Sequence, residues 1–448
     1  MNRPAGTLAL VLHTHMPYVE GFGTWPFGEE WLWEAIACCY EPLLDVLDAA
    51  PGRVTLSATP VLVDQLEAPG ALERCAAFLR DVRPASHALD LAEAGSAGEA
   101  AALEHSAAAY AQAAQALARG DLAARLARHT TWTSAATHAV LPLLATDAGV
   151  RLQLATGIAA HRARCGAWAG GFWLPECAHA PWLDPLLEAA GVHATCVDLT
   201  DLEVDVRRPL RSPAGRLLVP LDRPALDLVW SRGGYPAGAA YRDTHRLTAR
   251  RHQAWAVDGA PYDPARAAAQ LERDAADFVA RVSERVRGGG LCVVAVDTEL
   301  IGLHWHEGAA WLAAVLEAAE VYGLAVVPLD DALAGVDPVP APAELPATSW
   351  GAPRGLATWS GPAAGGLAWR QRAAELRVAA AGGVPARALR ELLALQASDW
   401  AFLVSADTAG PYPRERAAGH EAALDAALAG GGAPAALRNL APHLAPWG

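Results

Sequence analysis

The run LCVVAVDTE at residues 291–299 places six apolar residues directly before Asp297. Two other apolar runs end in the same way: LALVL leads to His13, and FWLP leads to Glu176. Short apolar runs of this kind are typical of buried strands. Polar groups at the carboxyl ends of such strands are typical of α/β barrels and α/β sheets. The three runs therefore predict an α/β fold with its functional groups at strand ends.

Strand and helix signals alternate over roughly the first 340 residues. Strands are predicted at 7–12, 54–57, 171–175, 194–198, 216–221, 227–231, 291–296 and 325–328. Helices are predicted at 28–49, 149–164, 182–190, 263–286 and 308–321. Repeated strand–helix units of this kind predict a parallel barrel or sheet.

The chain divides into three regions. Residues 1–340 are predicted to form the catalytic barrel, and the Ala-rich segment 68–130 reads as a helical insertion within it. The segment DPVPAP at 337–342 is a Pro-rich linker by composition. Residues 341–448 are predicted to form a helical domain, with helices at 366–380, 386–398 and 415–428.

The composition excludes several classes of function. A net charge of −14 without a basic cluster argues against nucleic acid or an anionic membrane as a partner. No apolar run reaches 18 residues, so no membrane span is predicted, and the first apolar run reads as a strand and not as a signal peptide. The 35 basic residues are all Arg, which excludes Schiff-base lysines and a Lys-dependent P-loop.

The seven cysteines are scattered and form no CxxC motif. An odd number without such pairing indicates a reducing, cytoplasmic environment. The composition is compatible with a neutral substrate, and it predicts no oligomeric state.

Glu176 and Asp297 are the main candidates for chemistry. Glu176 lies between Trp-Leu-Pro and Cys-Ala-His, which solvate a carboxylate poorly, so a function or a charged partner is expected. Asp297 and Glu299 fall on the same side if the strand continues. Two carboxylates on two strand ends are the smallest set of catalytic groups that cleaves a glycosidic bond.

The histidine pairs His13-x-His15 and His304-x-His306 have two interpretations. Histidines at alternate positions of a strand end are typical metal ligands. They are equally suited to binding sugar hydroxyls or orienting carboxylates, and the spacing does not decide between these roles.

Aromatic residues are frequent beside these motifs. Sixteen Trp residues offer many flat apolar faces on which sugar rings can stack. The segment RGGYPAGAA at 232–240 reads as a flexible loop that follows the predicted strand 227–231. Tyr235 in this loop could cover the site and exclude water, or it could pack on the barrel rim.

Five motifs in this order identify a family resemblance: HTHMPYVEGFGTWPFGEEWLWEAI, ATHAVLPLL, GFWLPECAH, VDTELIGLHWHEG and LQASDWAFLVS. Together they resemble glycoside hydrolase family 57, and within it the 1,4-α-glucan branching enzymes more than the amylases. The resemblance runs from Leu8 to about His420.

The resemblance implies a fold and a mechanism. The expected fold is α/β, an incomplete (β/α)7 barrel with a helical insertion and a C-terminal all-α domain. The expected chemistry is retaining, acts on an α-glucan, and requires no metal or cofactor. By position in the motifs, Glu176 is the expected nucleophile and Asp297 the expected general acid/base.

The resemblance also implies a set of sugar-binding residues, in which His13, His15 and His138 line the donor subsite. Trp350 and Trp359 match the sugar-stacking tryptophans, and Tyr235 belongs to a mobile loop. The full expected set is His13, His15, His138, Trp173, Tyr235, Trp255, His304, Trp350, Trp359 and Asp399.

Other functions stay open from the sequence. A 4-α-glucanotransferase or an α-glucan hydrolase would use the same carboxylate pair. A metal-dependent hydrolase would use His13, His15 and Asp297. An inactive glycan-binding homologue is the third alternative, because the segment 241–263 is shorter than in many relatives.

Overall fold

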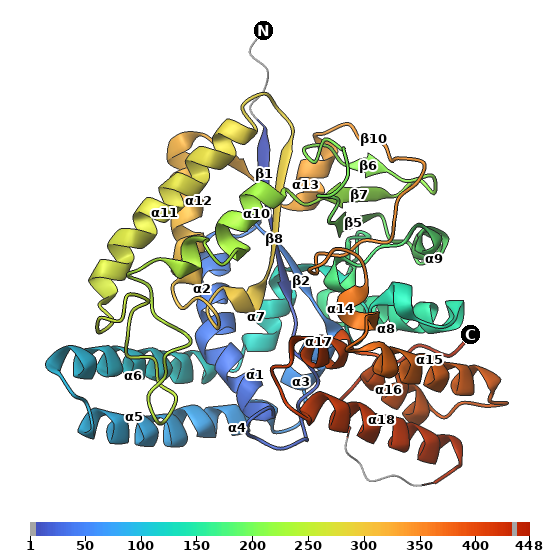
Figure 1. Cartoon of the computed structure of the whole chain (residues 1–448), viewed down its shortest axis with the longest axis horizontal. Coiled ribbons are helices and arrows are strands. Elements are labelled where there is room, and N and C mark those ends of the chain that lie inside the picture. Colours follow the sequence, from blue (N-terminus) through green and yellow to red (C-terminus); the bar gives the residue numbers. More distant parts are fainter. Residues whose placement is uncertain (1–5, 432–436) are drawn as a thin grey trace.

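The computed structural model describes residues 6–431 and 437–448, and a parallel sheet forms its centre (Figure 1). The strand order is β4-β3-β2-β1-β8, and β9 pairs with the start of β1. The bounds are β1 Thr7–Thr14, β2 Thr55–Ala58, β3 Thr130–Ser134, β4 Phe172–Trp173, β8 Leu291–Asp297 and β9 Ala325–Val326. All these pairings are parallel.

The register of this sheet aligns the ends that carry the polar motifs. His13 at the end of β1 lies opposite Asp297 on β8 and opposite Ser57 on β2. The apolar residues of β1 and β8 are buried, as expected for parallel strands covered on both faces. A bridge between Gly171 and Ala194 continues the curve toward β5. The predicted incomplete (β/α)7 barrel is confirmed.

A second, smaller sheet lies beside the barrel (Figure 1). Its order is β10-β6-β7-β5, with bounds β5 Ala194–Val197, β6 Leu210–Arg211, β7 Leu217–Pro220 and β10 Val339–Pro340. The strand β10 lies within the predicted linker, and Ala341 N donates to Arg211 O at 2.9 Å. The linker prediction did not include this pairing, although Pro is compatible with an edge strand.

Helices cover the barrel, and α11 shows how the sequence forms them. Asp263 caps its first turn by accepting a hydrogen bond from Ala265 N at 2.9 Å. Its buried residues include Leu271, Ala275, Phe278 and Val282, which recur at helical spacing and face the core. The covering helices are α1 Glu29–Ala35, α2 Glu41–Ala49, α3 Pro60–Leu66, α8 Asp147–Cys165, α9 Asp184–Ala189, α11 Pro264–Arg285, α12 Gly308–Tyr322 and α13 Leu329–Ala334, with a π-helical turn at Ile36–Tyr40.

The segment between β2 and β3 is helical. After α3 it contains α4 Ala71–Ala77, a π-helical turn at Phe78–Val82, α5 Arg83–Ala92, α6 Ala97–Leu117 and α7 Leu122–His129. The strand β3 that follows was not predicted, because its sequence TTWTS is mostly polar. Two of its hydroxyls bond backbone carbonyls: Ser134 donates to Trp173 O on the neighbouring strand at 2.9 Å, and Thr130 donates to Leu126 O at 2.7 Å.

The predicted strand at 227–231 is wrong, because this segment belongs to helix α10, Arg223–Trp230. Asp222 accepts a hydrogen bond from Ala225 N at 3.2 Å, and Pro224 occupies the first turn. Leu226 and Val229 are buried at helical spacing and do not alternate as they would in a strand. The capping signal lies before the apolar run that suggested a strand. The Tyr235 loop therefore follows a helix.

The C-terminal helices pack together beside α8 (Figure 1). They are α14 Ala357–Ser360, α15 Gly365–Ala380, α16 Ala386–Leu395, α17 Ser398–Ala406 and α18 Tyr412–Leu428. Their core includes Leu392, Trp400 and Leu424, and it also takes in Val140 and Leu152 from the barrel side. The predicted helix 386–398 ends early, and a new helix begins at Ser398.

Within residues 6–431 and 437–448, no helix combines the length and the apolar content needed to cross a membrane.

Candidate active site

Glu176 lies in a tight turn directly after β4. Its backbone is left-handed, with φ 62° and ψ 21°, and Cys177 beside it also has a positive φ. His138, which contacts it, has a φ of 61°. Left-handed backbone is uncommon for residues other than glycine and concentrates at functional sites. The turn aims the Glu176 carboxylate back toward the strand ends instead of along the chain.

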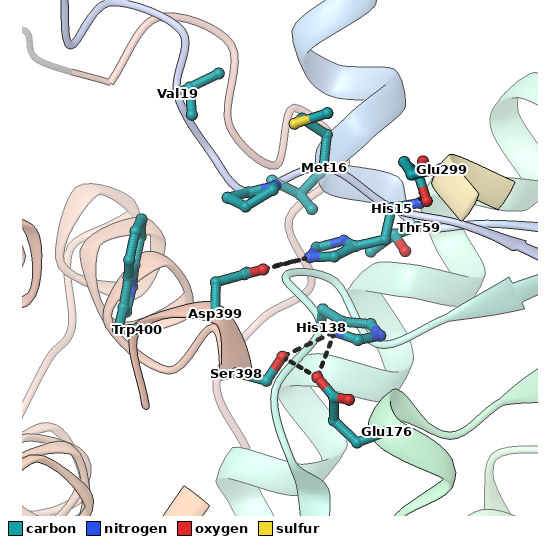
Figure 2. A network of polar contacts seen from close by, with 12 residues as sticks. His15, Met16, Val19, Thr59, His138, Glu176, Glu299, Ser398, Asp399 and Trp400 are labelled. Atoms are coloured by element: carbon teal, nitrogen blue, oxygen red, sulfur yellow. Dashed lines mark hydrogen bonds and ion pairs between the residues drawn. The ribbon is translucent and has the colours of Figure 1, made fainter. Parts of the chain in front are cut away.

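Two side chains donate hydrogen bonds to the Glu176 carboxylate, one to each oxygen. Trp350 Nε1 donates to Oε2 at 3.0 Å, and Ser398 Oγ donates to Oε1 at 2.9 Å. The Trp350 backbone N–H also donates to the Glu176 carbonyl at 3.1 Å. Figure 2 shows Ser398 and His138 on one side of this carboxylate. Glu176 is therefore fixed in orientation by residues from the C-terminal part of the chain.

The rings of His13, His15 and His138 stack on one another at the carboxyl end of β1. The rings of His15 and His138 are 4.1 Å apart at their centroids, and those of His13 and His138 are 4.8 Å apart. Trp173 stacks on His13, and their ring centroids are 4.7 Å apart. His13 and Trp173 are completely buried, whereas the side chain of His15 is 11% exposed. Of these rings, His15 is the one that a substrate can most readily reach.

His15 pairs with Asp399 in the first turn of α17. Its Nε2 lies 2.9 Å and 3.1 Å from the two carboxylate oxygens of Asp399 (Figure 2). Burial lowers the pKa of His15, but the Asp399 charge and hydrogen bond outweigh it, so the pKa is raised above its usual value. Burial lowers the pKa values of His13 and His138 well below the usual value, and the neighbouring histidines lower them further.

Glu299 lies in the turn after β8, close to His15 and to Tyr40 of the π-helical turn Ile36–Tyr40. Its Oε1 accepts hydrogen bonds from Tyr40 Oη at 2.7 Å and from His15 N at 3.1 Å. Burial raises the pKa of Glu299 to about 7.

Asp297 and Glu176 differ in how their charge is supported. Burial raises the pKa of Asp297 well above its usual value, and the charges of Glu299, Glu176 and Asp399 raise it further. Burial also raises the pKa of Glu176, but the donors Trp350 and Ser398 oppose this and favour the anion. Both pKa values are therefore raised, but only that of Glu176 is opposed by two hydrogen-bond donors. Such a pair can act as an acid and a nucleophile.

The structure brings eight of the predicted site residues into this constellation: His13, His15, His138, Trp173, Glu176, Asp297, Trp350 and Asp399. The other predicted residues have different partners.

Tyr235 is held against the covering helices. Its hydroxyl donates to Asp277 Oδ2 at 2.7 Å, and its ring lies against Phe278 and Trp311. This arrangement corresponds to the rim-packing interpretation. A role over the site would require the hydrogen bond to Asp277 to break.

Trp255 and His304 lie on another part of the surface. The Arg246 guanidinium stacks 4.3 Å above the Trp255 ring, and the carbonyl of His304 accepts a hydrogen bond from Thr244. The His304 side chain is exposed. Neither of these contacts involves Glu176, so the sugar-binding roles of Trp255 and His304 stay predictions.

Trp359 is only 2% exposed and belongs to the core of the C-terminal helices. The helix α14 turns the ring inward, where it leaves little free face for a sugar, and the stacking role of Trp359 stays a prediction.

Ser398 is the functional residue that sequence analysis missed. It precedes Asp399 in the motif LQASDWAFLVS, yet only Asp399 was assigned a role. Because Glu176 and Ser398 are 222 residues apart in the chain, no local pattern could join them.

In the described part of the chain, no group of three or more His, Cys, Asp or Glu residues is arranged to hold a metal ion. His13 and His15, which suggested a metal site, instead bond His138 and Asp399.

Comparisons with known proteins identify related sequences and structures. Residues 128–320 match the glycosyl hydrolase family 57 model, and residues 371–431 match the C-terminal model of 1,4-alpha-glucan branching enzyme. A probable 1,4-alpha-glucan branching enzyme of Mycobacterium tuberculosis is 33% identical over 479 aligned residues, covering 92% of this chain and 90% of the relative.

Two solved structures have the same fold. The branching enzyme of Pyrococcus horikoshii superposes with a TM-score of 0.86 at 30% identity, covering 93% of this chain and 88% of its own. That of Thermococcus kodakaraensis, solved with glucose, has a TM-score of 0.85 at 29% identity and the same coverage, 93% and 88%.

Proposed function

The chain belongs to glycoside hydrolase family 57, and on this basis we propose that it is a 1,4-α-glucan branching enzyme. It would cleave an α-1,4 link in a glucan chain and re-form the bond as an α-1,6 branch. The observation that carries this proposal is the pair Glu176 and Asp297, one carboxylate with a donor on each oxygen and one with a strongly raised pKa.

In the first step, Asp297 gives its proton to the leaving glycosidic oxygen while Glu176 attacks the anomeric carbon. The carbon–oxygen bond of the α-1,4 link breaks and an ester bond to Glu176 forms, with inversion. The raised pKa of Asp297 keeps its proton available near neutral pH. The two hydrogen bonds to Glu176 hold the attacking carboxylate in one orientation.

In the second step, Asp297 removes the proton from the 6-hydroxyl of an acceptor glucan. That oxygen attacks the anomeric carbon, the ester breaks, and Glu176 leaves as a carboxylate. Two inversions give overall retention. The negative charge that develops on Glu176 in this step is stabilised by the same Trp350 and Ser398 donors.

The neighbouring residues support substrate binding. His15 bonds Asp399 through Nε2, and its side chain is 11% exposed, more than that of His13 or His138. Trp350 is partly exposed and offers a ring beside the nucleophile. We propose that His15, Asp399 and Trp350 contact the donor glucan directly. His13 and His138 would support these residues without contacting the glucan, because both are buried.

Incubation with amylose tests the proposed activity. After isoamylase debranching, chain-length analysis should show new short chains that are absent from the untreated control. Release of reducing ends without α-1,6 links would indicate a hydrolase, and longer linear chains would indicate a 4-α-glucanotransferase.

Azide rescue tests the two carboxylate assignments separately. Azide should restore turnover of an activated α-glucoside to Glu176→Ala and give the β-azide, because it takes the place of the nucleophile. In Asp297→Ala it should attack the glycosyl-enzyme and give the α-azide. The opposite pairing of anomers and variants would reverse the assignment.

A further inference from the structure

An uninterrupted chain of hydrogen bonds ends on the nucleophile. Ser398 Oγ donates to Glu176 Oε1 at 2.9 Å, and His138 Nδ1 lies 2.8 Å from the same Ser398 oxygen. His138 Nε2 lies 2.9 Å from His13 Nε2, and His13 Nδ1 lies 3.4 Å from Ser57 Oγ. Figure 2 shows the part formed by His138, Ser398 and Glu176.

The number of protons fixes the direction of this chain. An ionised Glu176 only accepts hydrogen bonds, so the single Ser398 hydroxyl proton points to it. Ser398 must then accept from His138 Nδ1–H. His138 is neutral, since burial lowers its pKa, so its Nε2 carries a lone pair and accepts from His13 Nε2–H.

The same count of protons applies to His13 and Ser57, at the end of the hydrogen-bond chain furthest from Glu176. His13 is also neutral, so its Nδ1 accepts from the Ser57 hydroxyl. Each donor thus points toward Glu176. The two buried histidines are each held in one tautomer, and this arrangement is complete only while Glu176 carries its charge.

The position of Ser398 is fixed by backbone contacts as well. Its N–H donates to the His138 carbonyl at 3.1 Å, and Ala397 bridges to Ala139. Thr137 Oγ1 donates to Leu393 O at 2.5 Å, at the end of α16. The break between α16 and α17 is therefore docked on the His138 turn, and α17 begins with Ser398 facing the nucleophile.

We propose that Ser398 is a positioning residue that orients Glu176 and keeps it ionised, with His138 supplying the proton that forces the Ser398 hydroxyl toward the carboxylate. This rests on the proposed role of Glu176 as nucleophile. It assigns part of the catalytic machinery to the C-terminal helices, through a residue that contacts neither substrate nor reacting carbon.

Other charged groups also act on Glu176, so the test must separate them from Ser398. Asp399 and Asp297 disfavour its charge, and His15 favours it. His138 Nδ1 lies 3.7 Å from Glu176 Oε1. Substituting Ser398 with uncharged residues changes none of these charges, and any shift then reports the lost hydrogen bond.

The sharpest comparison is Ser398→Thr against Ser398→Val, because these side chains have the same shape and differ in the hydroxyl group. The variant S398V should lose about 10- to 100-fold in kcat/KM for cleavage of a maltooligosaccharide, as expected for a hydrogen bond to a charged group. The acidic limb of its pH profile should move to higher pH. The variant S398T should keep the wild-type limb and exceed S398V in rate at least tenfold.

Ser405→Ala is the matched control, because Ser405 lies on the same helix and donates to Thr358 O instead. It should behave as the wild type. Equal pH profiles and rates for S398T and S398V would overturn the proposal, because the shape of the side chain and not its hydroxyl would then matter.

A second readout does not need turnover. In protein labelled with carboxyl carbon-13 glutamate, the signal absent from Glu176→Gln belongs to Glu176. Its titration midpoint should rise in S398V and not in S398T, and an unchanged midpoint in S398V would refute the role. Failure of the wild type to branch amylose would refute the proposed function alone, because this titration and the cleavage assay do not depend on branch formation.

Discussion

Replacing Glu299 with Gln should make the protein more stable at alkaline pH while narrowing its active pH range. Glu299 is 9% exposed and lies next to Tyr40 and His15, both of which donate to its Oε1. Burial raises its pKa from an ordinary value of 4.5 to about 7. The side chain of Gln has a similar shape but never carries a charge.

The pKa gives the size of the effect on stability. A rise from 4.5 to about 7 corresponds to about 3 kcal/mol, since each pKa unit is 1.36 kcal/mol. Because the folded-state pKa is raised, this stability is fully present below pH 4.5 and is lost as the pH rises through about 7. The stability of the variant relative to the wild type should therefore increase by up to about 3 kcal/mol between pH 4 and pH 9.

Activity should change in the opposite sense. After burial, the Glu299 charge is the largest of the influences that raise the pKa of Asp297. Removing it lets Asp297 lose its proton at lower pH. The acid needed for the first step is then absent sooner, so the alkaline limb of the kcat/KM profile should move to lower pH.

Thermal unfolding followed across this pH range, with the pH profile of maltooligosaccharide cleavage, measures both effects. Glu344→Gln is the matched control, because Glu344 is exposed, and it should show neither trend. A difference in melting temperature that is the same at pH 4 and pH 9, or an unmoved alkaline limb, would refute the reasoning.

Three further predictions concern the rest of the site. Trp350→Phe removes the N–H that binds Glu176 Oε2, so kcat/KM should fall about 10- to 100-fold and the acidic limb of the pH profile should move to higher pH. Trp230→Phe, which changes the neighbouring ring, is the control and should leave both the rate and the pH profile unchanged. Exhaustive chelation should leave activity intact, and stoichiometric zinc lost together with activity would contradict this. Tyr235→Ala should reduce branching more than cleavage, measured as α-1,6 links per reducing end, and equal losses would exclude a lid role.

The barrel was predictable because buried parallel strands need apolar residues on both faces. The runs before His13 and Asp297 satisfy this need, and the structure places both residues side by side at the same sheet edge. The strand β3 escaped prediction because it is mostly polar, and two of its hydroxyls bond backbone carbonyls, one of them on the neighbouring strand β4. The helix α10 was mistaken for a strand because its cap, Asp222, lies before the apolar run that was considered.

Motif resemblance predicted the position of the site residues better than their exposure. His15, Asp399 and Trp350 lie where a substrate can reach them, but Trp359 carries the same kind of motif and is buried. Exposure depends on the packing of whole helices, and a short motif contains no information about it. Tyr235 illustrates the same limit, since its partner Asp277 lies 42 residues further along the chain.

The C-terminal helices show most clearly what the sequence could not convey. Their composition and helical periodicity indicate a separate domain, and their core is largely their own. Yet Ser398 bonds Glu176, and Asp399 pairs with His15, from one turn of one helix. A chain ending before this helix would keep both carboxylates, Glu176 and Asp297, on their strand ends. It would lose a donor that favours the charged form of the first and the carboxylate whose charge raises the pKa of His15 most. The proposed catalytic unit is therefore the barrel together with these helices.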